Sequence, residues 1–225
     1  MKQFFLSLAL TFCVLTVSAQ KDVTRFLGIP VDGTKLEMKK QLEAKGFSPS
    51  FEDPNILEGE FNGMDVHLHI VTNNNKVYRI MVADAKTQDE GAIKIRYNNL
   101  CRQFENNSKY MSLNDYTIGN EEDISYEITV HSKRYDAQFY QKPLEQDSAI
   151  IAEEFQNYLL SKYTQEQLEN PTEEIAKDIF QQSFSYAFDK TTKKSVWFTI
   201  ADFRGEYYIV MYYDNEYNKA NGEDL

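Results

Sequence analysis

Cysteine, glycine and basic residues are scarce in this sequence. Two cysteines among 225 residues cannot build a disulfide framework, and nine scattered glycines form no glycine-rich phosphate loop. Only 24 Lys and Arg residues stand against 35 Asp and Glu, which gives a formal net charge of -11. Nucleic acids and anionic membrane surfaces attract basic proteins, so the acidity argues against both as partners.

Apolar and aromatic residues are plentiful by contrast. They make up 42% of the chain, which is enough to bury a core and argues against disorder. Tyrosine and phenylalanine occur 15 times each, a richness typical of β-strands with wide buried faces. The length suits one domain of ordinary to large size, or two small ones.

Residues 1–20 are predicted to be a signal peptide that is removed. Lys2 supplies a short positive start, Phe4 to Val17 form an apolar run too short to span a bilayer, and Val17-Ser18-Ala19 places small residues before a cleavage point. The alternatives are a buried N-terminal helix and a lipid anchor on Cys13, which Phe12 disfavours. We therefore expect an exported protein, periplasmic or extracellular, with no membrane insertion after cleavage.

The first half of the mature chain predicts a helix, an antiparallel meander and a second helix. A capping box of Thr34 and Glu37 starts the first helix and Gly46 ends it. Alternating apolar residues predict strands over 57–61, 64–70 and 77–82, the first two joined by the hairpin pair Asn62-Gly63. Apolar residues at helical spacing predict a helix over 88–110, with Cys101 as a buried, unreactive thiol.

The second half predicts two short strands, two helices and a final hairpin. The strands are expected over 126–130 and 135–139, around a tight turn at Ser132-Lys133. After a weak internal joint near 141–147 comes a helix around 151–159. The next helix is expected to have Asn170 as its cap and Pro171 as its first residue. Its apolar side comprises Ile175, Ile179, Phe180, Phe184 and Phe188. The last hairpin joins 196–203 to 207–213.

These elements predict a single α+β domain over residues 21–225. Its expected architecture is an antiparallel β-sheet with helices packed mainly on one face.

Two resemblances accompany this pattern. The stretches Phe26 to Thr34, Gly46-Phe47, Leu57 to Gly63 and the C-terminal residues 212–215 and 218–225 are similar to exported proteins of gut Gram-negative anaerobes, most without an assigned function. Residues 26–84 also resemble one helix-plus-meander unit of the β-lactamase-inhibitor-protein-like fold. That fold includes enzyme inhibitors and outer-membrane assembly lipoproteins, but this sequence lacks the disulfides of the inhibitors and the lipobox of the lipoproteins.

One strand carries a candidate metal site. Asp65, His67 and His69 share a strand face, because side chains repeat every two residues, and imidazole and carboxylate groups bind zinc. The competing interpretation is a solvent-exposed strand face with ordinary polar alternation. It is favoured because no third histidine lies nearby in the sequence and His131 is expected to belong to another strand. No metal and no cofactor is predicted.

Catalytic signatures are weak. The sequence has no Gly-x-Ser-x-Gly elbow, and no Cys-His signature surrounds Cys101. Paired acidic residues such as Glu58/Glu60 and Glu153/Glu154 are plentiful, but runs of neighbouring acids are typical of solvated faces and not of two carboxylates across a cleft.

The aromatic surplus concentrates on the last hairpin. A platform for a sugar or a peptide is one interpretation, and core packing of a large sheet is the other. The candidate binding residues are Trp197, Tyr207, Tyr208, Tyr212 and Tyr213.

The sequence therefore favours an exported, non-catalytic binding or interaction protein of the cell envelope, with an unknown protein, peptide or glycan as partner. The alternative is a secreted hydrolase acting on glycan or peptide.

Overall fold

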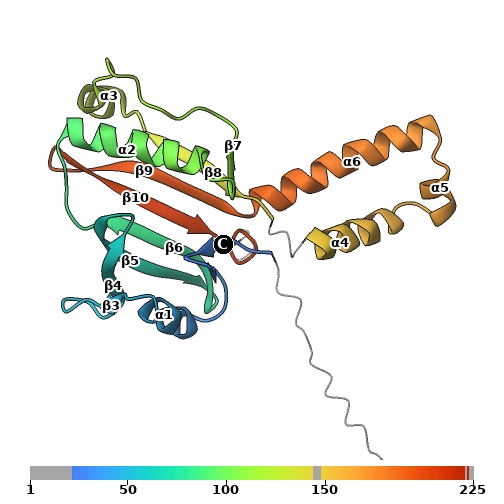
Figure 1. The fold of residues 1–225 in the computed structure, drawn as a ribbon, viewed down its shortest axis with the longest axis horizontal. Coiled ribbons are helices and arrows are strands. Elements are labelled where there is room, and N and C mark those ends of the chain that lie inside the picture. The colour runs from blue at the N-terminus through green and yellow to red at the C-terminus, as the bar shows by residue number, and fades with distance from the viewer. Residues whose placement is uncertain (1–21, 144–147, 221, 223–225) are drawn as a thin grey trace, which may run out of the picture.

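Eight strands form one antiparallel sheet in the order β3-β4-β5-β6-β10-β9-β8-β7 (Figure 1). The computed structural model describes residues 22–143, 148–220 and 222. The strands of the sheet are β3 (Ser48–Pro49), β4 (Ile56–Phe61), β5 (Met64–Asn73), β6 (Lys76–Asp84), β7 (Tyr110–Ser112), β8 (Asp136–Gln141), β9 (Ser195–Phe203) and β10 (Glu206–Asp214). A separate two-stranded ribbon consists of β1 (Arg25–Phe26) and β2 (Ile29–Pro30). The predicted signal peptide lies outside the described residues.

The two halves of the sheet meet where β6 pairs with β10. Met211 lies opposite Val82 and Tyr213 lies opposite Ile80, so the C-terminal strand sits at the centre of the sheet. The predicted meander and the final hairpin are both confirmed. Their turns, Asn62-Gly63 and Arg204-Gly205, have positive φ at both positions, as a two-residue hairpin turn requires.

Two helices cover one face of this sheet. In α1 (Lys35–Glu43), the capping box of Thr34 and Glu37 is present, and Met38 and Leu42 are fully buried against β5 and β6. In α2 (Glu90–Glu105), a predicted apolar stripe packs on β10 and its neighbours. The stripe comprises Ile93, Tyr97, Leu100 and Phe104, and Cys101 is buried beside it. The chain is an α+β protein whose core lies between these helices and the sheet.

The opposite face of the sheet carries mostly half-buried side chains. His67, Met81 and Tyr212 belong to it, because they alternate along their strands with the buried core positions.

One predicted strand is wrong. Residues 126–130 lie in a helix, α3 (Ile124–His131), although β-branched residues alternate with polar ones there. The Asp123 side chain accepts a hydrogen bond from the Tyr126 amide and so starts the helix. Ile124 and Ile128, four residues apart, then both reach the core. Ser132 ends the helix in the left-handed conformation, where the sequence predicted a tight turn between strands.

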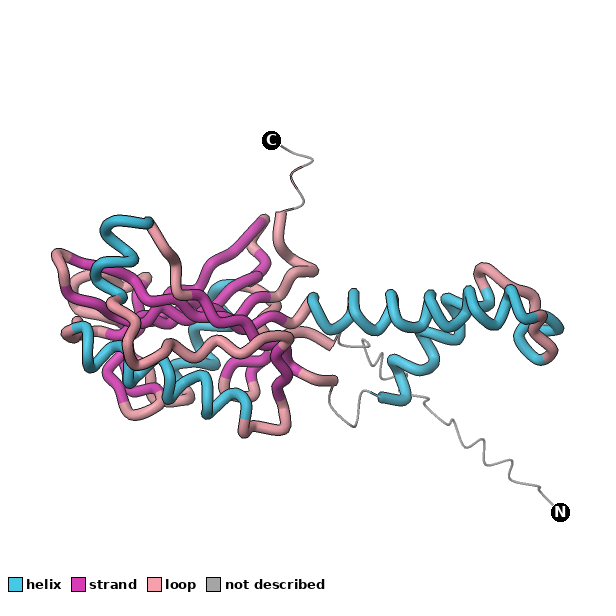
Figure 2. The backbone as a smooth tube through the Cα atoms, turned by 90° about the horizontal axis from the view of Figure 1, so that it is seen from above, coloured by secondary structure: helices cyan, strands magenta, loops and turns pink. Residues whose placement is uncertain are grey.

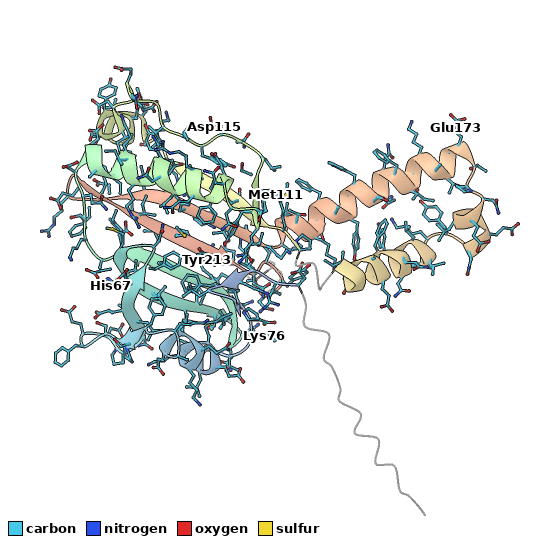
Figure 3. All side chains as sticks on the ribbon, in the orientation of Figure 1. His67, Lys76, Met111, Asp115, Glu173 and Tyr213 are labelled. Carbon is cyan, nitrogen blue, oxygen red and sulfur yellow. The ribbon has the colours of Figure 1, made fainter. Side chains whose placement is uncertain are left out.

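Three helices form an arm that extends away from the sheet (Figures 1 and 2). They are α4 (Ser148–Leu160), α5 (Gln165–Glu169) and α6 (Glu173–Thr192). The arm follows the joint that the sequence predicted near 141–147, of which residues 144–147 lie outside the described part. Figure 3 marks Glu173, where α6 begins, at the far end of the arm. No described helix is both long and apolar enough to cross a membrane.

The start of α6 differs from the prediction. Thr172 caps the helix by accepting a hydrogen bond from the Ile175 amide, and Glu173 is the first helical residue. Asn170 instead ends α5, where its amide donates to the Glu166 carbonyl. The residue before a proline is disfavoured in helical geometry, so the chain turns at Asn170-Pro171 before the new helix starts.

The apolar side predicted for α6 is divided between two surfaces. The inner side faces α4, where Tyr158 donates a hydrogen bond to Gln182 at 2.6 Å and Phe155 contacts Tyr186. The outer side exposes Phe180, Phe184 and Phe188 at a spacing of four residues. These three rings therefore contribute little to holding the arm together.

Candidate functional site

A cavity of about 730 Å³ opens on the covered side of the sheet, between α2 and the β1–β2 ribbon. Strands β4, β7, β8 and β10, together with loop residues beside these elements, supply the rest of its lining. Its apolar and aromatic lining residues are Leu27, Phe61, Leu100, Phe104, Tyr110, Met211 and Tyr213. Since these residues come from five separate segments, the cavity is a product of the tertiary fold.

Strand β10 supplies part of the apolar lining. Met211 and Tyr213 lie two residues apart and therefore point to the same side. Tyr213 is packed edge-on against Phe26, with ring centroids 4.8 Å apart, and its hydroxyl interacts with that of Tyr110. Burial raises the pKa of Tyr213 well above its ordinary value, so the phenol stays neutral.

Helix α2 forms one wall. Leu100, Gln103 and Phe104 lie on one side of the helix, because residues three and four apart are neighbours there. Phe104 is stacked on Phe139 with centroids 4.7 Å apart, which fixes its ring. The Asn62 side chain donates a hydrogen bond to Gln103 at 2.9 Å and so ties this wall to the β4–β5 turn.

The β1–β2 turn forms part of the rim. Leu27 and Gly28 both have positive φ, and this conformation is strained for leucine. The Gln141 side chain holds the neighbouring backbone: it accepts from the Arg25 amide and donates to the Arg25 carbonyl, both at 2.7 Å. The buried Nε of Arg25 makes no hydrogen bond with any described residue.

Charged side chains at the cavity are mostly basic. Arg25, Lys109 and Lys142 line it, and Glu60 is the one acidic residue among the lining residues of the described chain.

The five predicted aromatic residues do not form one surface. Tyr207 and Tyr213 point to the covered face and are buried, whereas Trp197, Tyr208 and Tyr212 point to the opposite face and are half-buried. Of the five, Tyr213 alone is among the lining residues of the cavity.

Trp197 and Tyr212 interact with each other and with an ion pair. Their rings are stacked with centroids 4.0 Å apart, and the Arg79 guanidinium lies 4.7 Å from the Tyr212 ring. Asp214 accepts a hydrogen bond from the Trp197 indole at 3.0 Å and binds Arg79 through both carboxylate oxygens. These contacts give both rings a structural role on that face.

Asp65, His67 and His69 lie on one face of β5, as predicted. Asp65 is paired with Lys86 at 2.9 Å, and the His67 Nε2 lies 3.8 Å from a Glu58 oxygen. Burial, and then the neighbouring His67, lower the pKa of His69. No group of three or more His, Cys, Asp or Glu side chains within the described ranges is placed to hold a metal ion.

The remaining candidates for chemistry lie away from the cavity. His131 is exposed at the end of α3, with its Nδ1 2.9 Å from Glu127. In Figure 3, His67 is labelled apart from Tyr213, which lines the cavity. Cys101 is buried, as predicted, and burial raises the pKa of its thiol to about 12, which keeps it protonated.

The sequence did not reveal the cavity as a site. The pair Asn62-Gly63 and the stripe containing Leu100 and Phe104 were recognised, but as elements of structure. The rim residues Arg25, Lys109 and Lys142 belong to no motif and are brought together by strand pairing.

Compared with known proteins, the chain matches no family model, no curated protein and no solved structure.

Proposed function

We propose that this protein is an exported, non-catalytic binding protein whose ligand occupies the cavity between α2 and the β1–β2 ribbon. Export is inferred from the sequence of residues 1–20, whereas the binding role is inferred from the cavity. The observation that carries the proposal is the cavity itself, with its wall of rings already fixed in place.

The size and lining of the cavity support this role. About 730 Å³ lies within the range of roughly 300–1,000 Å³ that is typical of small-molecule sites. Such sites combine mostly apolar walls with a few polar groups that orient the ligand. Here Phe104 and Met211 supply apolar surface, while Arg25 and Gln103 lie among the polar groups.

The alternative, a hydrolase acting on glycan or peptide, gains no support from this cavity. General acid–base or nucleophilic hydrolysis needs a histidine, a reactive thiol or hydroxyl, or two carboxylates around the bound substrate. The described lining contributes Glu60 as its one carboxylate, and His67 and His131 lie elsewhere. Binding is therefore the function that the geometry favours.

We expect the cavity to bind the neutral fluorescent probe N-phenyl-1-naphthylamine with a saturable increase in emission. Gln103→Trp should weaken this binding by at least about tenfold, because an indole at that position fills the mouth of the cavity. The matched control is Ile95→Trp on the same helix, since Ile95 is exposed and does not line the cavity. It should bind within about twofold of the wild type.

Circular dichroism melts would establish that both variants are folded. Equal binding by the two variants, or an emission that rises linearly without saturation, would show that the cavity is not the site. Turnover of a glycan or a peptide by the purified protein would contradict the non-catalytic role.

A further inference from the structure

We infer that the ligand of this cavity is an organic anion with an apolar body and one carboxylate head. Arg25, Lys109 and Lys142 bind the carboxylate head. This inference rests on the proposed function and adds the chemical class of the ligand.

The cavity reverses the charge of the rest of the protein locally. The chain as a whole has a formal net charge of -11, yet three cationic side chains line the cavity. Among the described acidic residues, Glu60 is the one that lines it. A basic site on an acidic protein attracts anions locally while the rest of the surface repels them. The charge distribution therefore selects a small anion that reaches the cavity, and not an extended polyanion.

Arg25 presents hydrogen-bond donors at the cavity that lack good acceptors. Its backbone is held on both sides by the Gln141 amide, so the side chain starts from a fixed point. Its Nη1 makes one long contact, 3.5 Å to the Gly28 carbonyl, and its buried Nε makes no hydrogen bond with any described residue. A buried donor without an acceptor is unfavourable, and a carboxylate matches the paired donors of a guanidinium.

Strand pairing brings the two lysines to the same edge. Tyr110 pairs with Gln141 where β7 meets β8, and the Lys142 amide donates to the Lys109 carbonyl at 2.8 Å. Lys109 and Lys142 therefore flank the strand pair whose Gln141 holds Arg25. Neither lysine forms an ion pair with a carboxylate in the described part of the chain. Both lysines line the cavity, so an anionic head bound there would lie close to their positive charges.

The interior defines the rest of the ligand. Phe104, Met211 and Tyr213 offer rings and a thioether, and the buried Tyr213 hydroxyl is already engaged with Tyr110. An apolar body gains free energy by leaving water for this surface, whereas a second charged group would find no partner there. A fatty acid of medium length has this combination of body and head.

The test compares decanoate with 1-decanol, which has the same chain without the charge. Each would displace N-phenyl-1-naphthylamine from the wild-type protein, below the micelle concentration of decanoate. We expect decanoate to bind at least about tenfold more tightly than 1-decanol, because charge-assisted hydrogen bonds hold its carboxylate. Arg25→Gln should weaken decanoate about tenfold and leave 1-decanol within about twofold.

Arg204→Gln is the matched control, since Arg204 is exposed in the β9–β10 turn and does not line the cavity. Decanoate should bind this variant as it binds the wild type. Equal affinity for decanoate and 1-decanol, or equal losses in the two arginine variants, would overturn the anionic class while leaving the cavity as a binding site. Absence of saturable probe binding would instead refute the proposed function itself.

Discussion

Replacing Arg96 by alanine is expected to lower the free energy of unfolding by about 3–5 kcal/mol. Arg96 lies on α2 and binds both oxygens of Asp84 on β6, at 2.7 and 2.5 Å. The Asp84 side chain is only 2% exposed, and it also accepts from the Ile209 amide on β10. Without Arg96, a buried carboxylate keeps one weak donor and loses its counter-charge, so the folded state carries an uncompensated charge.

Urea denaturation followed by circular dichroism measures this loss. The matched control is Lys86→Ala, which breaks the exposed pair between Lys86 and Asp65 and should cost less than about 0.5 kcal/mol. Arg96 also connects α2, a wall of the cavity, to the sheet. A loss below about 1 kcal/mol for Arg96→Ala would mean that the pair does not fasten α2 to the sheet.

Replacing Asp214 by alanine should cost about 3 kcal/mol, the second largest effect. The Asp214 carboxylate is 3% exposed and binds the Arg79 guanidinium through two contacts of 2.6 Å. Hydrogen bonding to Asp214 raises the pKa of Arg79, so this cation keeps its charge. The variant would also leave the Trp197 indole without its acceptor and loosen the stack of Trp197 on Tyr212.

Fluorescence adds a local readout, because Trp197 is the chain's one tryptophan. In Asp214→Ala its emission should shift to longer wavelength as the ring gains contact with water. Asp65→Ala, an exposed carboxylate on the same sheet, is the control and should change neither stability nor emission appreciably. An unchanged emission in Asp214→Ala would contradict the structural role assigned to these rings.

Local patterns predicted the parts of the fold that depend on neighbouring residues. The capping box of Thr34 and Glu37 and the hairpin pair Asn62-Gly63 act within a few residues, so the sequence reveals them directly. The apolar stripe along α2 could also be predicted from the sequence, because its four residues lie on one helix face and are buried together.

The misread elements depend on partners far along the chain. Glu90 of α2 accepts hydrogen bonds from the Ile124 amide and the Ser125 hydroxyl, which hold the start of α3 where Ile124 and Ile128 reach the core. The alternating pattern of residues 126–130 does not indicate a contact between this segment and Glu90. Tertiary context overrode the strand propensity of this segment.

The cavity was hidden for the same reason. Its rim requires that β7 pair with β8 and that Gln141 reach Arg25, 116 residues away. The aromatic hairpin was visible instead, but the alternation of side chains along a strand places Tyr212 and Tyr213 on opposite faces. Aromatic richness thus marked the centre of the sheet, and Tyr213 is the member of that set that reaches the candidate site.

The most direct test of the proposed anion-binding cavity is a titration of the ¹⁵N-labelled protein, without the predicted signal peptide, with decanoate, followed through its backbone amide resonances. The account predicts saturable shifts gathered around the cavity, at Leu27-Gly28, Asn62-Gly63 and the Gln103–Tyr110 segment. Shifts gathered instead along the exposed Phe180, Phe184 and Phe188 face of α6, or no saturable shifts at all, would contradict it.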